Sequence, residues 1–292
     1  MAQSTKTVVA IGKFDGVHLG HRELLITASK LARRAGLVSV CYIIENEGAK
    51  ALLLPALRER HICELGIDKI IVQNLTHDFM NMSDLDFVKT ILAEALSCAH
   101  VVVGYDFRFA RGRSSGAEEL KNLCKTHGIE CTVIPEVVCN LGSDSITASS
   151  TNIRSFLSQG DVRSASAILG RAYSICGEVV HGRQLGRTLD FPTANIIPPR
   201  GLIIPKAGVY ATRVTLGDKV YQSVTNIGDN PTVSESNSIT VETNIIGFDG
   251  DIYSKEITVE FTDRIRDEIK FASLDELKNQ IKNDIQAAKL TK

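Results

Sequence analysis

The stretch Gly12–Leu24, which reads GKFDGVHLGHREL, constrains the fold of this chain more than any other part of the sequence. Strand-forming residues from Thr7 to Ile11 lead into it. A helical pattern follows, with apolar residues three or four positions apart, and Gly36 is placed to end it. At a strand–turn–helix crossover of a parallel sheet, backbone N–H groups and the helix N-terminus attract phosphate. The stretch therefore predicts an α/β fold with a nucleotide site at its first turn.

Two histidines, His18 and His21, occur in this turn at H-x-G-H spacing. We expect Gly20 between them to leave room for a phosphate between the two rings. A bare H-x-G-H is equally compatible with a plain turn that carries two surface histidines. The preceding F-D-G-V run favours nucleotide binding, because it has no packing reason to stand before the histidines.

The first half of the chain alternates predicted strands with predicted helices. The strands are expected at Leu37–Ile44, Lys69–Gln73, His100–Gly104 and Ile129–Ile134, and the helices at Leu57–Leu65, Phe87–Leu96 and around Leu120–Cys124. This alternation predicts a doubly wound, Rossmann-like α/β domain.

The loop GYDFRFARGR at Gly104–Arg113 follows one of these strands. Ligands bind beyond the carboxyl ends of strands in such sheets, so arginines and phenylalanines here suit an anion beside an aromatic ring. A solvated basic loop is the alternative.

The stretch ASSTNIR at Ala148–Arg154 marks the start of a helix. Its hydroxyl residues suit helix capping, and free N–H groups at a helix start accept phosphate. Arg154 lies about one turn into the helix, where it can neutralise the phosphate charge. A plain serine cap is the alternative.

From Tyr173 onward the pattern changes to short strand-forming runs separated by turns. The runs are Ser174–Val180, Val209–Leu216, Val220–Thr225, Ile239–Ile246 and Lys255–Phe261. They predict a compact antiparallel barrel, and a helix at Leu274–Ile285 follows it. We therefore expect one domain at 1–158, a helical linker at 159–172 and a second domain at 173–292.

Three features of the second half suggest chemistry. Thr193 and Asn195 lie two residues apart, so in an extended chain both face one side and offer the oxygen ligands that Mg²⁺ prefers. Glu242 lies in an otherwise apolar strand, where a carboxylate needs a partner or a function. Arg266 and Phe271 could line a cleft for an aromatic ring. The alternatives are an ordinary turn, an outward-pointing charge and a solvated charged face.

Composition excludes several classes of protein. The chain has 292 residues, 43% of them hydrophobic and 23% charged, as in an ordinary globular protein of two domains. A net charge of −1 argues against binding to nucleic acid or membranes by bulk charge, and no apolar run reaches membrane-spanning length. Seven cysteines without a C-x-x-C pair indicate reduced thiols. We expect a cytoplasmic protein without a signal peptide, either monomeric or weakly homo-oligomeric.

The sequence resembles the bacterial bifunctional riboflavin kinase/FAD synthetases along nearly its whole length. In the first half, the opening turn, the loop after the fourth strand and the S-S-T-x-I-R element match in order. The second half resembles the flavokinase domain in the elements G-x-V-x-x-G (Gly177–Gly182), F-P-T-A-N (Phe191–Asn195), G-V-Y (Gly208–Tyr210), N-I-G-x-x-P-T (Asn226–Thr232), V-E (Val241-Glu242) and R-x-x-x-x-F (Arg266–Phe271). The resemblance implies conversion of riboflavin to FMN and of FMN to FAD, with ATP as co-substrate and Mg²⁺ as cofactor.

The same resemblance implies a role for each candidate residue. For FMN adenylylation it implies an ATP site made of Gly12, Phe14, Asp15, His18, His21, Ser149, Ser150, Thr151 and Arg154, with a flavin or phosphate loop containing Asp106, Phe107, Arg108 and Arg111. For riboflavin phosphorylation it implies an ATP site at Gly177, Gly182, Thr193 and Asn195, Mg²⁺ on Thr193 and Asn195, and flavin contacts from Arg266 and Phe271. Glu242 is implied as the general base of the kinase, and His21 and Arg154 are implied to stabilise charge in the adenylyl transfer.

The chain departs from the family pattern at four places. The P-H-P turn usual after the second strand is missing from the run Tyr42–Gly48. Lys13, Ala110 and Asp190 replace an asparagine and two glycines that are common in the family. Two alternatives therefore stay open: an enzyme with only one of the two activities, and a non-catalytic flavin-sensing protein.

Overall fold

The computed structural model describes residues 5–46, 48–181, 191–230 and 238–291. Contacts within the chain divide it into two compact units, Met1–Ser150 and Thr151–Lys292. The division falls earlier than the boundary at residue 158 that we expected from the sequence, because the helices that follow it pack with the second unit.

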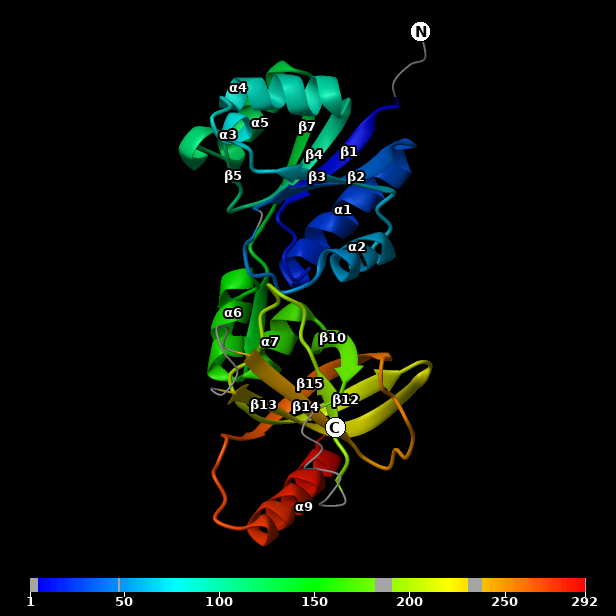
Figure 1. Ribbon diagram of the computed structural model, residues 1–292. Coiled ribbons are helices and arrows are strands. Elements are labelled where there is room, and N and C mark those ends of the chain that lie inside the picture. The colour runs from blue at the N-terminus through cyan, green and yellow to red at the C-terminus, as the bar shows by residue number, and fades with distance from the viewer. Residues whose placement is uncertain (1–4, 47, 182–190, 231–237, 292) are drawn as a thin grey trace. The chain divides into compact units, whose positions relative to one another are not determined.

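The first unit contains a five-stranded parallel sheet in the order β3-β2-β1-β4-β7 (Figure 1). Its strands are β1 (Thr7–Gly12), β2 (Val38–Glu45), β3 (Lys69–Asn74), β4 (Cys98–Gly104) and β7 (Glu130–Ile134). Its helices are α1 (Leu19–Ala35), α2 (Pro55–Glu64), α3 (His77–Met80), α4 (Asp84–Asp86), η1 (Phe87–Ala95), η2 (Arg111–Arg113) and α5 (Ala117–Thr126).

Side chains of β1 alternate between two apolar cores, one on each face of the sheet. Val8 and Ala10 pack in the core that contains Leu25 of α1, whereas Val9 and Ile11 pack in the core that contains η1 and α5. Both faces of the sheet are thus covered by helices, and the doubly wound architecture that the sequence predicts is confirmed.

The sequence did not reveal several short elements of the first unit. Two small antiparallel sheets pair β5 (Arg108–Phe109) with β6 (Ser115–Gly116) and β8 (Val138–Leu141) with β9 (Asp144–Thr147). The helix expected at 87–96 is the π-helix η1. These differences are local and leave the parallel sheet as expected.

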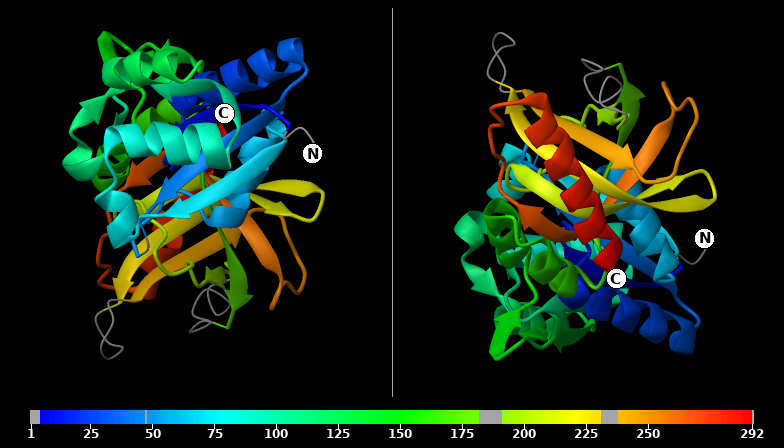
Figure 2. Two further views of the ribbon diagram at one scale, coloured as in Figure 1. Left: turned by 90° about the horizontal axis from the view of Figure 1, so that it is seen from above. Right: turned by 90° about the horizontal axis from the view of Figure 1, so that it is seen from below.

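The second unit is a closed antiparallel barrel in the order β10-β11-β14-β13-β12-β15, which confirms the predicted barrel. Its strands are β10 (Tyr173–Val180), β11 (Ala194–Ile196), β12 (Gly208–Leu216), β13 (Lys219–Asn230), β14 (Ser238–Ile245) and β15 (Glu256–Arg266). Its helices are α6 (Ser150–Gln159, whose first residue belongs to the first unit), α7 (Val162–Leu169) and α9 (Leu274–Leu290). Figure 2 shows α9 lying across the outside of the barrel.

Helices α6 and α7 are held on the barrel by hydrogen bonds and an ion pair. Lys206 N donates to Leu157 O at 2.9 Å, and Arg163 Nη2 lies 3.0 Å from Asp263 Oδ2. These contacts explain why the helical segment 159–172, which we expected as a linker, groups with the second unit.

A chain of buried hydroxyl groups joins three barrel strands. Thr212 lies 2.8 Å from both Ser223 and Thr225, and Thr225 lies 2.9 Å from Thr243, with the distances measured between hydroxyl oxygens. All four residues are buried. These hydroxyl–hydroxyl contacts satisfy polar groups that would otherwise oppose the burial of β12, β13 and β14.

An ion pair fixes α9 to the barrel. Arg266 of β15 donates from Nη2 to Asp284 Oδ2 at 2.7 Å and from Nε to Asp284 Oδ1 at 3.0 Å. Gln280 donates to the same carboxylate at 2.8 Å. Asp284 is only 2% exposed, so the pairing with this arginine compensates for the cost of burying its carboxylate. In the described part of the chain, no helix is both long and apolar enough to span a membrane.

We expect Arg266→Met to lower the free energy of unfolding by about 3 kcal/mol, because Asp284 would keep a buried charge without its cationic partner. Urea denaturation followed by circular dichroism measures this loss. Arg213→Met is the matched control, since the Arg213–Glu260 pair is largely exposed and should contribute less than about 1 kcal/mol. Equal losses in the two variants would contradict the assignment.

Candidate functional site

The turn between β1 and α1 contains three residues with positive φ angles. Phe14, Gly16 and Val17 have φ angles of 50°, 85° and 44°. The left-handed region is costly for phenylalanine and valine, and both side chains are fully buried. Gly12 leaves room for the Phe14 ring, because an added Cβ would lie 3.2 Å from it. Packing therefore holds this turn in one strained conformation.

Asp15 connects this turn to two other segments. Its carboxylate accepts a hydrogen bond from Leu52 N at 2.7 Å, and its carbonyl oxygen accepts one from the Ser150 hydroxyl at 2.8 Å. The first bond anchors the loop after β2, and the second anchors the start of α6. Asp15 thus shapes the site through these contacts with the protein.

His18 and His21 form a stacked pair at the start of α1. Their ring centroids are 3.6 Å apart, and His18 Nδ1 accepts a hydrogen bond from His21 N at 3.4 Å. A ring nitrogen that accepts from a backbone N–H carries no proton, so the proton of neutral His18 lies on Nε2. His18 is therefore both the helix cap and a donor.

The expectation that Gly20 leaves room for a phosphate between the two rings is wrong. Stacked rings leave no space between them. A Cβ on Gly20 would lie 3.2 Å from the His18 ring and 3.3 Å from Ala148 O. Gly20 instead allows the His18 ring and the backbone before α6 to approach α1 closely.

His21 is held in its neutral form. Burial lowers its pKa well below the usual value, and the nearby His18 lowers it further. Its Nδ1 atom is buried and has no hydrogen-bond partner among the described residues. A buried ring nitrogen without a partner is costly unless a ligand supplies one.

The loop after β4 lies at the same edge of the sheet as this turn. β1 and β4 are adjacent and parallel, and the strand order reverses between them, which is where ligands bind in such sheets. Asp106 is exposed, whereas Phe107 stacks on Phe109 with ring centroids 5.7 Å apart. The structure therefore brings the two predicted ligand segments together.

The two arginines of this loop have neighbours in the protein. Arg108 lies over the start of α5, where it contributes to a lowered pKa of Glu119 after the larger effect of backbone hydrogen bonds. Arg111 opens η2, and its N–H donates to Met82 O at 3.0 Å. Both side chains are exposed.

An ion pair between β2 and α2 spans the loop after β2, where the P-H-P turn is missing. Arg58 Nη1 lies 2.9 Å from Glu45 Oε1, and Arg58 is only 6% exposed. Two further Arg58 nitrogens, Nε and Nη2, are buried without hydrogen-bond partners among the described residues. No sequence pattern pointed to this pair, whose members are 13 residues apart in the chain.

The remaining candidates of the first half lie around the start of α6. Ser149 precedes the helix and Ser150 is its first residue. Thr151 and Arg154 lie further along α6, in the second unit. Their roles in binding ATP stay predictions.

In the barrel, a row of polar residues crosses three strands. Glu242 of β14 lies directly opposite Asn195 of β11 on one side and Asn226 of β13 on the other. Residues opposite each other in a sheet point to the same face, and the neighbours Val241 and Thr243 are buried, so the row lies on the outside of the barrel. Asn226 was part of a quoted motif but not of our predicted site.

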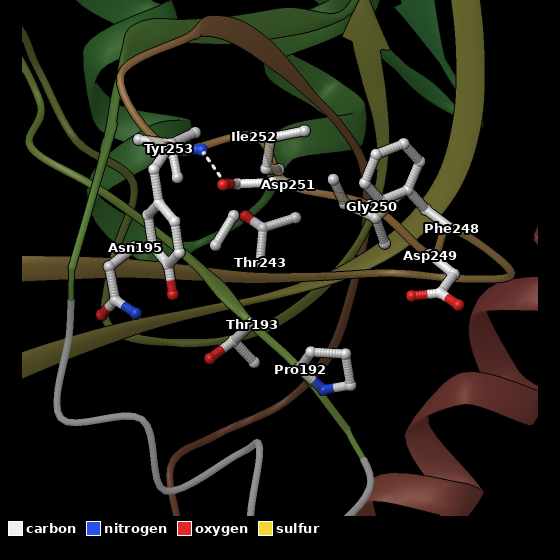
Figure 3. Close-up of a pocket in the computed structure, with 13 residues that line it drawn as sticks. Pro192, Thr193, Asn195, Thr243, Phe248, Asp249, Gly250, Asp251, Ile252 and Tyr253 are labelled. Carbon is white, nitrogen blue, oxygen red and sulfur yellow. Dashed lines mark hydrogen bonds between the residues drawn. The ribbon is translucent and has the colours of Figure 1, made fainter.

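A cavity of about 440 Å³ adjoins this row. Thr193 and Asn195 line it together with the segment from Phe248 to Tyr253, which connects β14 to β15. Figure 3 shows the side chains of Thr193, Asn195 and Tyr253 around this space. Sequence reasoning missed the segment, although two aromatic residues beside Asp-Gly-Asp were its signal.

The structure describes only one of the two glycines predicted for the ATP site of the kinase. Gly177 of β10 does not line the cavity, and a Cβ there would lie 2.6 Å from the Ile196 side chain and 2.9 Å from Ile197 O. It allows β11, the strand of Asn195, to lie against β10. Gly182 and Asp190 lie outside the described residues.

Arg266 and Phe271 lie together, with the guanidinium carbon 5.9 Å from the ring centroid. Arg266 donates hydrogen bonds to the Asp284 carboxylate and to the Asp267 carbonyl oxygen. Its contact with flavin stays a prediction. The nearby Glu268, which the sequence did not suggest, lies 3.4 Å from Asn226 Nδ2. This carboxylate extends the polar row of β11, β14 and β13.

Comparison with known proteins identifies a family for each half of the chain. The FAD synthetase family matches residues 1–152, and the riboflavin kinase family matches residues 169–291. The bifunctional riboflavin kinase/FMN adenylyltransferase of Escherichia coli K12 is 35% identical over 287 residues, covering 95% of this chain and 90% of that protein. The chain belongs to the bifunctional riboflavin kinase/FMN adenylyltransferase family. It contains both a FAD synthetase domain and a riboflavin kinase domain.

Other relatives in the bifunctional riboflavin kinase/FMN adenylyltransferase family extend over the same length. The Bacillus subtilis protein is 33% identical over 299 residues, which cover 98% of this chain and 92% of that protein. A crystal structure described as a macrolide-efflux protein from Streptococcus pneumoniae has a TM-score of 0.89 and 31% identity, covering 100% of this chain and 96% of that chain. The family resemblance found in the sequence is thereby confirmed.

Ala110, which stands where the bifunctional family usually has glycine, has φ 65° and ψ 178°. This backbone region is essentially restricted to glycine, and the strain of an alanine there exceeds the entropic cost of introducing glycine. We expect Ala110→Gly to raise the free energy of unfolding by about 1 kcal/mol in urea denaturation. Ala56→Gly in α2 is the matched control and should lower it by about 0.5–1 kcal/mol. A loss of stability in Ala110→Gly would contradict this interpretation.

Proposed function

We propose that this chain phosphorylates riboflavin to FMN in its barrel and adenylylates FMN to FAD in its α/β unit, with ATP as co-substrate of both reactions. The observation that carries the kinase assignment is the register that places Glu242 between Asn195 and Asn226, with Asn195 also lining the cavity. We assign adenylylation to residues 1–158 and phosphorylation to the barrel at 173–292, with α7 as the connection.

In the kinase reaction, we assign Glu242 as the general base. Its carboxylate takes the proton of the terminal ribityl hydroxyl as that oxygen attacks the γ-phosphorus of ATP, and ADP leaves. Asn226 and Asn195, on either side, offer amide groups that can orient the hydroxyl and the phosphate. Phosphoryl transfer needs mostly positioning and charge neutralisation, which this polar row can provide.

Mg²⁺ fits the donors present in the barrel. The Thr193 hydroxyl and the Asn195 amide oxygen both line the cavity, and a hard cation prefers a few such oxygens together with substrate phosphates. Bound there, Mg²⁺ would neutralise charge on the phosphates of ATP. The aromatic ring of Tyr253 gives the same cavity a flat wall for the nucleotide base.

In the adenylyl transfer, a phosphate oxygen of FMN attacks the α-phosphorus of ATP, and pyrophosphate leaves. His18 can donate from Nε2, and the unpartnered Nδ1 of neutral His21 gives this buried site a further polar group for a phosphate. Both are held in place before substrate binds, which is the condition for strong stabilisation of developing charge. Arg154 and the loop of Arg108 and Arg111 would contribute positive charge.

The location is proposed on the basis of the cysteines. All seven are free thiols, and burial raises the pKa of Cys98 and Cys124 to about 12. Such thiols suit a reducing compartment. We therefore propose that the protein acts in the cytoplasm.

The first test is incubation of the purified chain with Mg²⁺ and ATP plus either riboflavin or FMN, followed by chromatography of the flavins. FMN and FAD from riboflavin, and FAD from FMN, are expected. FMN without FAD would favour a single-activity kinase, for which the missing P-H-P turn is the specific observation. Flavin binding without any product would overturn the proposal in favour of a flavin sensor.

We expect Glu242→Gln to lower the rate of FMN formation from riboflavin at least about a hundredfold, because the amide cannot take the proton. FAD formation from supplied FMN should stay at the wild-type rate. Glu260→Gln, on β15 of the same barrel, is the matched control and should keep both rates. Retained kinase activity in Glu242→Gln would exclude Glu242 as the base.

We expect His21→Ala to lower FAD formation from FMN about a hundredfold or more, because a preorganised group at the phosphate site is lost. FMN formation from riboflavin should be unchanged. His61→Ala in α2 removes a histidine outside the site and controls for nonspecific effects. Unchanged FAD formation in His21→Ala would show that this turn is not the adenylylation site.

A further inference from the structure

Tyr253, in the wall of the barrel cavity, has a second ring stacked on it. The centroids of the His181 and Tyr253 rings are 3.7 Å apart, and the ring planes differ by 27°. Tyr253 lines the cavity, whereas His181 is exposed and does not line it. His181 therefore supports the tyrosine ring from outside the cavity.

The backbone on both sides of this stack is fixed by β10. Ser254 N donates to Val179 O at 2.9 Å, and Val179 N donates to Lys255 O at 3.0 Å. Tyr253 N donates to Asp251 Oδ1 at 3.0 Å. These bonds fix the position of the Tyr253 backbone, but they do not fix the rotation of its ring.

The contact with His181 restricts the rotation of the Tyr253 ring, which the backbone hydrogen bonds do not. His181 follows directly after β10, and Val179 of the same strand forms hydrogen bonds with Ser254 and Lys255 beside Tyr253, so the backbone next to each ring is anchored at β10. A half-buried tyrosine without a stacking partner can change rotamer, and ordering it again on binding costs affinity. The stacked imidazole limits this freedom before any ligand enters.

We propose that His181 is a positioning residue of the kinase, which holds Tyr253 as a flat wall on which the base of the nucleotide stacks. The inference rests on the proposed function, because it takes the cavity to be the nucleotide site of the kinase. A purine covers more of a phenol ring than a pyrimidine does. The wall should therefore also increase the preference for ATP over UTP or CTP.

The test compares His181→Ala and His181→Phe in the full-length protein, with FMN formation from riboflavin as the assay. Aromatic pairs and ordered side chains each contribute affinity corresponding to a few-fold to about tenfold. In His181→Ala we expect KM for ATP to rise about three- to tenfold, with kcat within about twofold of wild type. In His181→Phe, which retains a stacking ring, both values should stay near wild type.

FAD formation by the same protein is the control for this test. KM for ATP in FAD formation from supplied FMN should be identical in wild type and His181→Ala, because that reaction is assigned to the other unit. The preference for ATP over UTP in the kinase reaction should shrink in His181→Ala and return in His181→Phe. An unchanged KM in His181→Ala, a loss in kcat alone, or equal losses in both variants would overturn the inference.

A readout that does not need turnover separates this inference from the proposed function. Photolabelling with 8-azido-ATP, mapped by mass spectrometry, should mark the segment Phe248–Tyr253 in wild type and mark it less in His181→Ala. If wild type forms no FMN but shows this pattern, the proposed kinase function fails, and only the positioning of a bound nucleotide by His181 and Tyr253 is supported. If the wild-type label is absent from this segment, the inference is overturned whatever the activity.

Discussion

The pairing of β14 with β11 and β13 is the constraint on which the candidate kinase site depends. A shift of one residue in β14 would turn Glu242 into the barrel and Val241 out of it. The two asparagines opposite Glu242 belong to two different strands, and β14 brings the three residues together by lying between β11 and β13. The buried hydroxyl chain through Thr212, Thr225 and Thr243 contributes to this pairing, because another register would leave those groups without partners.

The proposed adenylylation site depends on a different kind of constraint. In the turn after β1, two large apolar residues take up a backbone conformation that they avoid elsewhere, and their burial maintains it. This conformation presents Asp15 to two other segments and leads into the cap of α1. The site is thus rigid before ATP binds, so a substitution in its apolar residues should affect chemistry as much as stability.

Sequence patterns predicted the fold class because periodicity is a local property, visible within single segments. They failed for β5, β6 and β11, which have two or three residues each and show no periodicity. The candidate sites were predicted where a motif is continuous, as at His18 and His21. The partners of these motifs, such as Arg58, Asn226 and Glu268, were missed because they come from distant segments. The role of Gly20 was misjudged, since glycine spacing shows that two groups approach closely but not which groups.

The attachment of α9 to the barrel bears on how the catalytic halves of this family can be separated. Asp284, near the end of the chain, is the partner of Arg266 on β15, which is itself one of the two predicted flavin contacts. A shortened barrel that stopped at its last strand would expose the apolar side chains that α9 covers and leave Arg266 without its carboxylate. The smallest independently folding kinase should therefore include the helix, although no residue of α9 lines the cavity beside Asn195.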